Sequence, residues 1–473
     1  MAERLKVDVC VIGAGSGGLT VAAGASQLGA SVVLIERRKM GGDCLNYGCV
    51  PSKALIAAAK AAQAQRESAR FGVRGGPPQI DFRAVHDHVH GVIAAIAPQD
   101  SEARFTGLGV RVIRASARFI GRNEVAADDL IVEARRFVVA TGSGPATPDV
   151  PGLAGLPFLT NETVFEQTTL PARLLVIGGG PIGLELAQAH RRLGSEVFVV
   201  AGRRVLPKDD PELAAVVLTR LRREGVEVLE GARAVAARQS AAGFALEIEQ
   251  DGARRTVEGT SLLVAAGRTA SLDGLGLEAA GVETMATGVK VDARLRSTNP
   301  HIYAVGDAAG GLQFTHVAGY HAGIVLRNAL FRLPAKANAP IPWVTYTDPE
   351  LAHVGLNEAQ AREAGHELRI LRWAFAENDR AQAERATDGL IKVVATKRGR
   401  ILGASIAGAH AGELIQPWVL ALANRLPLAK LAGVVAPYPT LGEVGKRAAG
   451  SFFMPKLFNA RTRAIVRFLA RFG

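Results

Sequence analysis

The hydrophobic pattern of residues 9–38 predicts a strand, a tight turn, a helix and a second strand. The first apolar run ends at a glycine-rich turn, and the second run reads LGASVVLIE. In the turn, Gly13 permits the sharp change of direction, Gly15 lets the backbone approach a pyrophosphate, and Gly18 allows close packing of helix on strand. An anion would then lie at the helix N-terminus, where free N–H groups favour it. Glu36 ends the second strand, where a carboxylate can bind ribose hydroxyls.

The same pattern recurs at residues 174–204. An apolar run again leads into a glycine turn, here built from Gly178, Gly180 and Gly183, and a helix and a second strand follow. One such glycine motif is weak evidence, because glycine-rich turns are common. Two copies in the same strand–turn–helix–strand context predict two dinucleotide sites.

The two copies differ at the end of the second strand. Glu36 of the first copy corresponds to Ala201 of the second, and Arg203 and Arg204 follow. The absent carboxylate removes a repulsion toward a 2′-phosphate, and the two arginines can bind that phosphate. The second site is therefore expected to take NADPH in preference to NADH.

Composition agrees with this architecture and limits the compartment. A chain of 473 residues is too long to fold around a single hydrophobic core, so two or three domains are expected. Its 53 glycines and 5% aromatic residues fit an α/β protein with many tight turns. Three cysteines argue against a secreted, disulfide-stapled protein. The short N-terminal apolar run leads into a glycine motif instead of a cleavage site, so we do not expect a signal peptide, and no uncharged apolar run reaches about 18 residues. We expect a cytoplasmic protein without a transmembrane helix.

A pair of cysteines stands in the stretch GGDCLNYGCVPSKAL, residues 41–55. In a reducing compartment, Cys44 and Cys49 are expected to be catalytic or metal-binding rather than structural. Further zinc ligands at a useful spacing are absent. A helix begins beside the second thiol, and Lys53 adds a positive charge, so a thiolate would be stabilised. The third cysteine, Cys10, lies in an apolar strand and is expected to be an inert core residue.

Several further motifs follow in a fixed order. They read FVVATGSGP (137–145), LLVAAGRTAS (262–271), IYAVGDAAGG (302–311) and PWVTYTDPELAHVG (342–355). With the two glycine motifs and the cysteine motif, they make essentially the whole chain resemble the pyridine nucleotide-disulphide oxidoreductases. That family includes dihydrolipoamide dehydrogenase, glutathione reductase and mercuric reductase.

The resemblance implies an α/β fold with two Rossmann-like dinucleotide-binding domains and a C-terminal α+β dimerisation domain. A discontinuous FAD-binding domain would comprise residues 1–150 and 271–340. An NAD(P)-binding domain would span 151–270, and the dimerisation domain 341–473. The active protein would be a homodimer whose active sites are shared between subunits.

The resemblance also assigns roles to the cysteine motif. Cys44 and Cys49 would form a redox-active disulfide against the flavin, with Cys49 on the flavin side and Cys44 meeting the acceptor. Lys53 would lie near the flavin and pair with Glu185.

Further FAD contacts are carried over from the same resemblance. Asp307 would bind the ribityl chain, and the segment from Gln313 to His316 would back the pyrimidine side of the ring, with His316 making a backbone contact at a helix start. The remaining expected cofactor contacts are Ala117, Thr141, Gly142, Phe314, Thr315 and Gly267.

No metal site is expected. His86, His88 and His90 alternate on a predicted helix, so they do not share a face, and we interpret them as surface or interface residues.

One departure from the disulfide-reducing members lies near the C-terminus. Those members carry a histidine that acts as acid and base for thiol interchange, followed by a glutamate. Here Tyr438 occupies the histidine position and Glu443 keeps the glutamate position. A tyrosine titrates near pH 10 and is a poor base at neutral pH. Mercuric reductases also place tyrosine there, although this chain lacks their C-terminal vicinal cysteines and N-terminal metal-binding domain.

The leading prediction is a reductase that passes electrons from NADPH through FAD to the disulfide and on to a metal ion, a small disulfide or a quinone. The alternative enzyme is a dihydrolipoamide dehydrogenase using NAD.

The net charge of +12 raises a third alternative, although no zinc-finger spacing or aromatic RNA-binding motif supports nucleic acid. Residues 444–473 contain no acidic residue, and their end is amphipathic. This tail could dock a redox protein on a membrane. We favour packing of its apolar face on the protein's own dimerisation domain. That face comprises Ile465, Phe468, Leu469 and Phe472, and the basic face comprises Arg463, Arg467 and Arg471.

Overall fold

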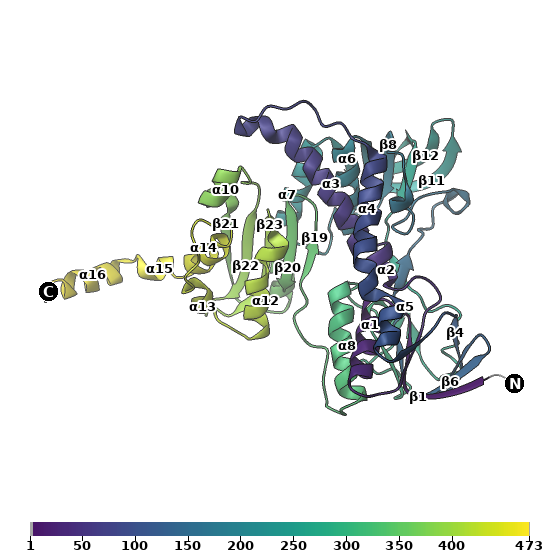
Figure 1. The fold of residues 1–473 in the computed structure, drawn as a ribbon. Coiled ribbons are helices and arrows are strands. Elements are labelled where there is room, and N and C mark those ends of the chain that lie inside the picture. The colour runs from purple at the N-terminus through teal and green to yellow at the C-terminus, as the bar shows by residue number, and fades with distance from the viewer. Residues whose placement is uncertain (1–2, 473) are drawn as a thin grey trace. The chain divides into compact units, whose positions relative to one another are not determined.

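The structure is a computed structural model that describes residues 3–472, and its contacts divide the chain into two units. Unit 1 contains the chain up to residue 202 together with 231–338, and unit 2 contains 203–230 together with the chain from 339 onward. Figure 1 shows the elements of both units, coloured along the chain. The domain boundaries expected from the sequence stay a prediction. The contacts group residues 203–230, expected in the NAD(P) domain, with the C-terminal segment.

The first sheet of unit 1 is parallel at its centre. Strand β1 lies between β2 and β6, β3 pairs with β2, and β18 pairs with β6. The first copy of the strand–turn–helix–strand pattern supplies β1, α1 and β2, as predicted. The elements are β1 (Glu3–Ile12), α1 (Ser16–Gln27), β2 (Val32–Ile35), β3 (Val110–Ile113), β4 (Ala117–Gly121), β5 (Glu124–Ala127), β6 (Leu130–Val139) and β18 (Ile302–Ala304).

Alternating side chains of β1 enter two different cores. Cys10 and Ile12 join the cluster on one face of the sheet, and Val9 and Val11 join the cluster on the other. This alternation follows from the strand period of two residues. Cys10 is fully buried, as expected, and burial raises the pKa of its thiol. A strand apolar on both faces requires helices on both sides.

The second copy of the pattern builds another parallel sheet in unit 1, in which β8 pairs with β9 and β14. A separate antiparallel meander and a two-stranded connection complete this part. The elements are β8 (Arg173–Ile177), α6 (Pro181–Leu193), β9 (Glu196–Ala201), β11 (Arg233–Ser240), β12 (Gly243–Gln250), β13 (Ala253–Gly259), β14 (Ser261–Val264), β7 (Ser143–Pro145) and β15 (Arg268–Ala270).

Helix α3 (Cys49–Glu67) packs against both α4 (Phe82–Ile96) and α6. On α4, the prediction that the three alternating histidines share no face is wrong for two of them. His86 and His90 are four residues apart, and their ring centroids lie 4.2 Å apart. Residues at this spacing lie one above the other on a helix.

Unit 2 is built on a five-stranded antiparallel sheet with the order β19-β20-β23-β22-β21. Its core contains Phe375 and Trp418, both buried. The elements are α7 (Pro211–Arg223), β19 (Trp343–Thr345), β20 (Glu350–Gly355), α9 (Glu358–Glu363), β21 (Leu368–Ala374), α10 (Asp379–Glu384), β22 (Leu390–Thr396), β23 (Ile401–Gly408), α12 (Gln416–Ala423), α14 (Glu443–Ser451), α15 (Met454–Leu457) and α16 (Ala460–Leu469).

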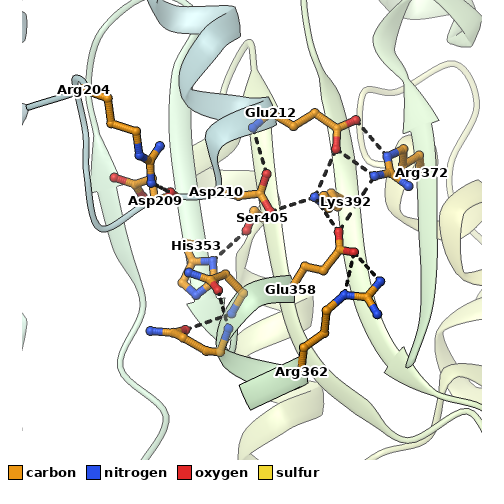
Figure 2. Close-up of polar contacts among 12 residues, drawn as sticks. Arg204, Asp209, Asp210, Glu212, His353, Glu358, Arg362, Arg372, Lys392 and Ser405 are labelled. Carbon is orange, nitrogen blue, oxygen red and sulfur yellow. Dashed lines mark hydrogen bonds and ion pairs between the residues drawn. The ribbon is translucent and has the colours of Figure 1, made fainter. Parts of the chain in front are cut away.

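A buried lysine joins α7 to this sheet, as Figure 2 shows. Lys392 is 4% exposed, and its Nζ lies 2.8 Å from Asp210, 3.0 Å from Glu212 and 3.0 Å from Glu358. Arg372 donates two hydrogen bonds to Glu212. The carboxylates surround the buried ammonium group from the N-terminal ends of α7 and α9, and this network explains why residues 203–230 cluster with the C-terminal segment.

The C-terminal helix does not bury its apolar face. Ile465, Phe468 and Leu469 are 56–57% exposed, and Phe472 is 74% exposed. The expectation that this face packs on the chain's own C-terminal domain is therefore wrong for the single chain. Among the described residues, no helix is long and apolar enough to cross a membrane.

We predict that Lys392→Met lowers the free energy of unfolding by about 3–5 kcal/mol, because three carboxylates lose their buried cation. Arg372 and, after it, Lys392 lower the pKa of Glu212, and Arg362 followed by Lys392 lowers the pKa of Glu358. The part of the stabilisation due to Lys392 is therefore complete above the unfolded carboxyl pKa of about 4.3. It is lost as the pH falls through the lower folded values. Urea unfolding at several pH values measures the effect.

Lys397→Met is the matched control. Lys397 pairs with Glu367 at 3.1 Å, but both side chains are well exposed, so its removal should cost about 0–1 kcal/mol. Equal losses in the two variants would contradict the importance of the buried network.

Candidate redox and nucleotide sites

The turn between β1 and α1 brings backbone atoms unusually close together. A Cβ on Gly18 would lie 1.9 Å from the Gly13 carbonyl oxygen, and one on Gly42 would lie 2.6 Å from the Gly15 Cα. Side chains at these positions would separate the segments. The glycines therefore allow these backbone segments to pack closely at the N-terminus of α1, where N–H groups can bind phosphate.

Glu36 lies directly after β2 and is 8% exposed. Its two carboxylate oxygens accept hydrogen bonds from the backbone N–H groups of Ala14 and Arg38, both at 2.6 Å. These bonds hold the carboxylate beside the glycine turn. A carboxylate has further lone pairs, so ribose hydroxyls can still donate to it.

The two cysteines of the motif lie on two consecutive helices. Cys44 lies on α2 (Gly42–Asn46) and is half-buried, while Cys49 is the first residue of α3 and is exposed. Both are free thiols in this structure. The Thr315 hydroxyl, at the start of α8 (Thr315–Ala329), lies 3.2 Å from the Cys49 sulfur.

This environment separates the acidities of the two thiols. The hydrogen bond with Cys44, followed by the Thr315 hydroxyl and the charge of Lys53, lowers the pKa of Cys49 to about 6, although burial opposes the shift. The same thiol–thiolate bond, burial and the charge on Cys49 raise the pKa of Cys44. At neutral pH, the reduced pair therefore holds one thiolate, on Cys49, and one proton, on Cys44.

Lys53 follows the cysteine pair by one helical turn on α3. Its Nζ lies 2.7 Å from Oε2 of Glu185, which is buried on α6. The ion pair expected from the sequence is thus present. It connects the helix that begins at Cys49 with the helix that follows the second glycine turn.

A polar group missed by the sequence analysis surrounds Asp307. The Ser143 hydroxyl donates to Asp307 at 2.5 Å, and Arg268 donates to Ser143 and lies 3.2 Å from the Asp43 carboxylate. Burial raises the pKa of Asp307, and the serine and arginine oppose that shift. All these residues stand inside the quoted motifs, but nothing in their spacing showed that they meet.

The other expected FAD contacts lie on several elements of unit 1. Thr141 has a buried hydroxyl with no hydrogen-bond partner among the described residues, so it is available to a ligand. His316 is the second residue of α8, and its ring stacks on Phe314. The remaining residues lie at the start of β4 (Ala117), after Thr141 (Gly142), before β15 (Gly267) and before Phe314 (Gln313).

The second glycine turn repeats the close approach of the first. A Cβ on Gly183 would lie 2.2 Å from the Gly178 carbonyl oxygen, whereas one on Gly180 would meet nothing within 4 Å. Beyond β9, Arg204 donates to the carbonyl oxygens of Pro207 and Asp209, at 2.9 and 2.7 Å. Arg203 is exposed and makes no hydrogen bond or ion pair with other described residues.

Tyr438 lies on the surface of unit 2 and is 68% exposed. Its hydroxyl donates to the Asp379 carboxylate at 2.8 Å. This bond and the nearby negative charges of Asp379 and Glu443 raise the pKa of the phenol. At neutral pH, an even smaller fraction of this phenol is therefore ionised than in an ordinary tyrosine, so it supplies almost no phenolate to act as a base. Asp379 was not found from the sequence, because it stands 59 residues before Tyr438.

Comparison with known proteins identifies the family. Residues 7–322 match the family described as pyridine nucleotide-disulphide oxidoreductase, and residues 341–449 match its dimerisation domain. The chain belongs to this family. Its members use FAD and a pyridine nucleotide, and the resemblance inferred from the motifs is confirmed.

Both curated and structural relatives cover nearly the whole chain. A mercuric reductase of Streptomyces lividans is 37% identical, with 94% of this chain and 96% of that protein covered. A dihydrolipoyl dehydrogenase of Thermus scotoductus is 36% identical, covering 92% and 95%.

Two solved structures have the same fold. LpdA from Mycobacterium tuberculosis has a TM-score of 0.86 at 28% identity, covering 94% of this chain and 99% of that chain. The Cu(II) complex of the HOCl-induced flavoprotein disulfide reductase RclA from Escherichia coli has a TM-score of 0.83 at 26% identity, covering 93% and 99%.

The residues present fit FAD. The glycine turn at the N-terminus of α1 suits a pyrophosphate, and the carboxylate of Glu36 is held beside it where ribose hydroxyls can donate. The buried Thr141 hydroxyl has no hydrogen-bond partner among the described residues and is available to the cofactor. FAD bound there would supply two-electron chemistry beside the thiols.

We predict that the long-wavelength thiolate–flavin absorption of the two-electron-reduced protein titrates with a midpoint near pH 6. The thiolate exists above that pH and is protonated below it. Thr315→Val should raise the midpoint, because the hydroxyl that stabilises the thiolate is lost, while Thr315→Ser should leave it nearly unchanged. A midpoint at or above the ordinary thiol value of about 8.5 would contradict the assignment.

Proposed function

We propose that this protein is an NADPH-dependent flavoprotein reductase that passes electrons through the Cys44–Cys49 pair to a metal ion. The main support for a metal ion as acceptor comes from Tyr438. Its phenol is exposed and hydrogen-bonded to Asp379, at the position where disulfide-reducing members place a histidine base. Homologues named mercuric reductase, and a solved relative with bound Cu(II), support a metal-ion acceptor.

The thiol acidities account for the electron and proton balance. With FAD held at the first glycine turn, the Cys44–Cys49 disulfide would receive the hydride equivalent of NADPH. One hydride carries two electrons and one proton, so cleavage of the S–S bond leaves a Cys49 thiolate and a Cys44 thiol. No further proton is required at neutral pH. Cys44 then meets the metal ion and releases its proton to solvent, and the Cys44–Cys49 bond re-forms as two electrons pass to the metal-ion acceptor.

Lys53 has two functions in this scheme. Its charge stabilises the Cys49 thiolate, and its ion pair with Glu185 holds the start of α3 against α6. The active unit would be a homodimer, because the chain contains the family's dimerisation domain and Tyr438 is remote in sequence from the thiols. In that dimer, Tyr438 and Glu443 of one subunit would face the thiols of the other.

Nucleotide preference provides one test. We predict that Arg203→Ala lowers kcat/KM for NADPH by about ten- to a hundredfold, because one charge-assisted contact with the 2′-phosphate is lost. The value for NADH should not change. Arg204→Ala should have a smaller effect, since that guanidinium already donates to two carbonyl oxygens of its own loop. Equal efficiency of both nucleotides in the unmodified enzyme would refute the NADPH preference.

The acceptor class provides a second test. We predict that the unmodified enzyme reduces Hg²⁺ or Cu²⁺ faster than lipoamide or oxidised glutathione. Tyr438→His should raise lipoamide turnover by up to about a hundredfold, because a positioned base is restored. Stopped-flow flavin reduction by NADPH should stay nearly unchanged.

Tyr438→Phe is the control, since it removes the hydroxyl without adding a base and should leave lipoamide turnover low. Brisk lipoamide turnover by the unmodified enzyme, with NAD as oxidant of dihydrolipoamide, would instead support the dihydrolipoamide dehydrogenase alternative.

The C-terminal helix favours a second role, docking on an anionic bilayer. Met454, Leu457 and Phe458 are exposed beside the apolar face of α16, and no acidic residue interrupts its arginines. An apolar face flanked by basic residues matches the interface of acidic lipids.

We predict that the protein sediments with phosphatidylserine vesicles at low salt and less with phosphatidylcholine vesicles. Phe468→Glu should abolish sedimentation without changing NADPH-dependent flavin reduction. Unchanged sedimentation in that variant, or none in the unmodified protein, would reject docking. If the dimer dissociates in Phe468→Glu, the face belongs to the subunit interface.

A further inference from the structure

Two histidines and a glutamate outside the redox site lie close together in unit 1. His86 and His90 stand on α4, and Glu166 ends the short helix η4 (Val164–Glu166). Each offers one ligand atom, and these atoms lie within 4.8 Å of one another. The three residues come from segments about 75 residues apart, so the fold and not local sequence brings them together.

The helix holds the two imidazoles on one face. His86 and His90 are separated by one turn, and their rings are tilted by 41° with centroids 4.2 Å apart. The Asp81 side chain caps the helix N-terminus through the Ala84 N–H, and Val89 is buried. His88 stands between the two histidines in sequence but is exposed. A histidine pair at this spacing can bind one metal ion.

Neighbouring groups orient both imidazoles. Nδ1 of His86 lies 2.9 Å from the Asp87 carboxylate. A carboxylate only accepts, so the ring donates from Nδ1 and keeps its Nε2 lone pair for a metal, as in carboxylate–histidine–zinc arrangements. Nε2 of His90 lies 3.2 Å from the Phe165 carbonyl oxygen and 3.7 Å from Glu166. A cation at this nitrogen would take the place of its proton, which would move to Nδ1.

We propose that His86, His90 and Glu166 form a binding site for one divalent transition-metal ion of the zinc class, which fastens α4 to η4. Two imidazole nitrogens and one carboxylate oxygen suit Zn²⁺, with water as the fourth ligand. Mg²⁺ and Ca²⁺ prefer all-oxygen sites. Glu166 is half exposed, so an ion can enter from solvent while the less exposed histidines hold it from α4.

Equilibrium dialysis against Zn²⁺ tests the proposal. The protein is used as the FAD-containing oxidised enzyme without a histidine tag, so that Cys44 and Cys49 form a disulfide and are not ligands. Bound metal is measured by mass spectrometry. We expect one Zn²⁺ per chain. His86→Ala, His90→Ala and Glu166→Gln should each weaken Zn²⁺ affinity at least about tenfold, and Asp87→Asn about ten- to a hundredfold.

His88→Ala is the matched control, because it removes an exposed imidazole from the same helix and should leave Zn²⁺ affinity unchanged. Zn²⁺ should also raise the Tm of the unmodified protein and of His88→Ala but not of His86→Ala. Flavin absorbance and circular dichroism verify that each variant is folded. Less than one bound Zn²⁺ per two chains, or equal affinity in His86→Ala and the unmodified protein, would overturn the proposal.

Discussion

The ion pair between Lys53 and Glu185 is the contact on which the redox site depends. Glu185 is buried on α6, and Lys53 stands one turn after Cys49 on α3. A buried carboxylate is strongly destabilising without a cation, so the two helices must stay in register. One helix begins at the redox thiol, and the other begins at the second glycine turn. The pair therefore holds the start of α3, with Cys49, against the helix that follows the second glycine turn.

Buried charges elsewhere follow the same rule, with different partners. Backbone N–H groups bind Glu36, a serine and an arginine surround Asp307, and three carboxylates surround Lys392. At the cysteines, a neighbouring thiol and a hydroxyl stabilise the thiolate together with Lys53. In each case, the stabilised charged group can still make one further interaction. Glu36 can accept from ribose, Asp307 can accept from the cofactor, and Lys392 joins α7 to the C-terminal sheet.

Glycine and apolar patterns were sufficient to predict both strand–turn–helix–strand units, because these depend on local backbone geometry and on side-chain period. The glycine pattern also predicted the place of Glu36, whereas the Lys53–Glu185 pair was predicted from the family resemblance. The histidines show the limit of such reasoning. The alternating pattern predicts no shared face, yet His86 and His90 are four residues apart and their ring centroids lie 4.2 Å from each other. In the single chain, the apolar face of the C-terminal helix is exposed and not packed as expected, since hydrophobic periodicity shows that a face exists and not what covers it.

The sequence by itself determined the family, the two glycine turns and the cysteine pair, because each rests on short motifs whose spacing carries its chemistry. The tertiary structure decided how those motifs are supported. Ser143, Arg268 and Asp43 meet around Asp307, Asp379 binds the Tyr438 hydroxyl, and Glu166 reaches the histidines of α4. These partners lie tens to hundreds of residues apart along the chain. Their effect on acidity and ligand binding depends on distances of a few ångströms, which only the folded chain defines.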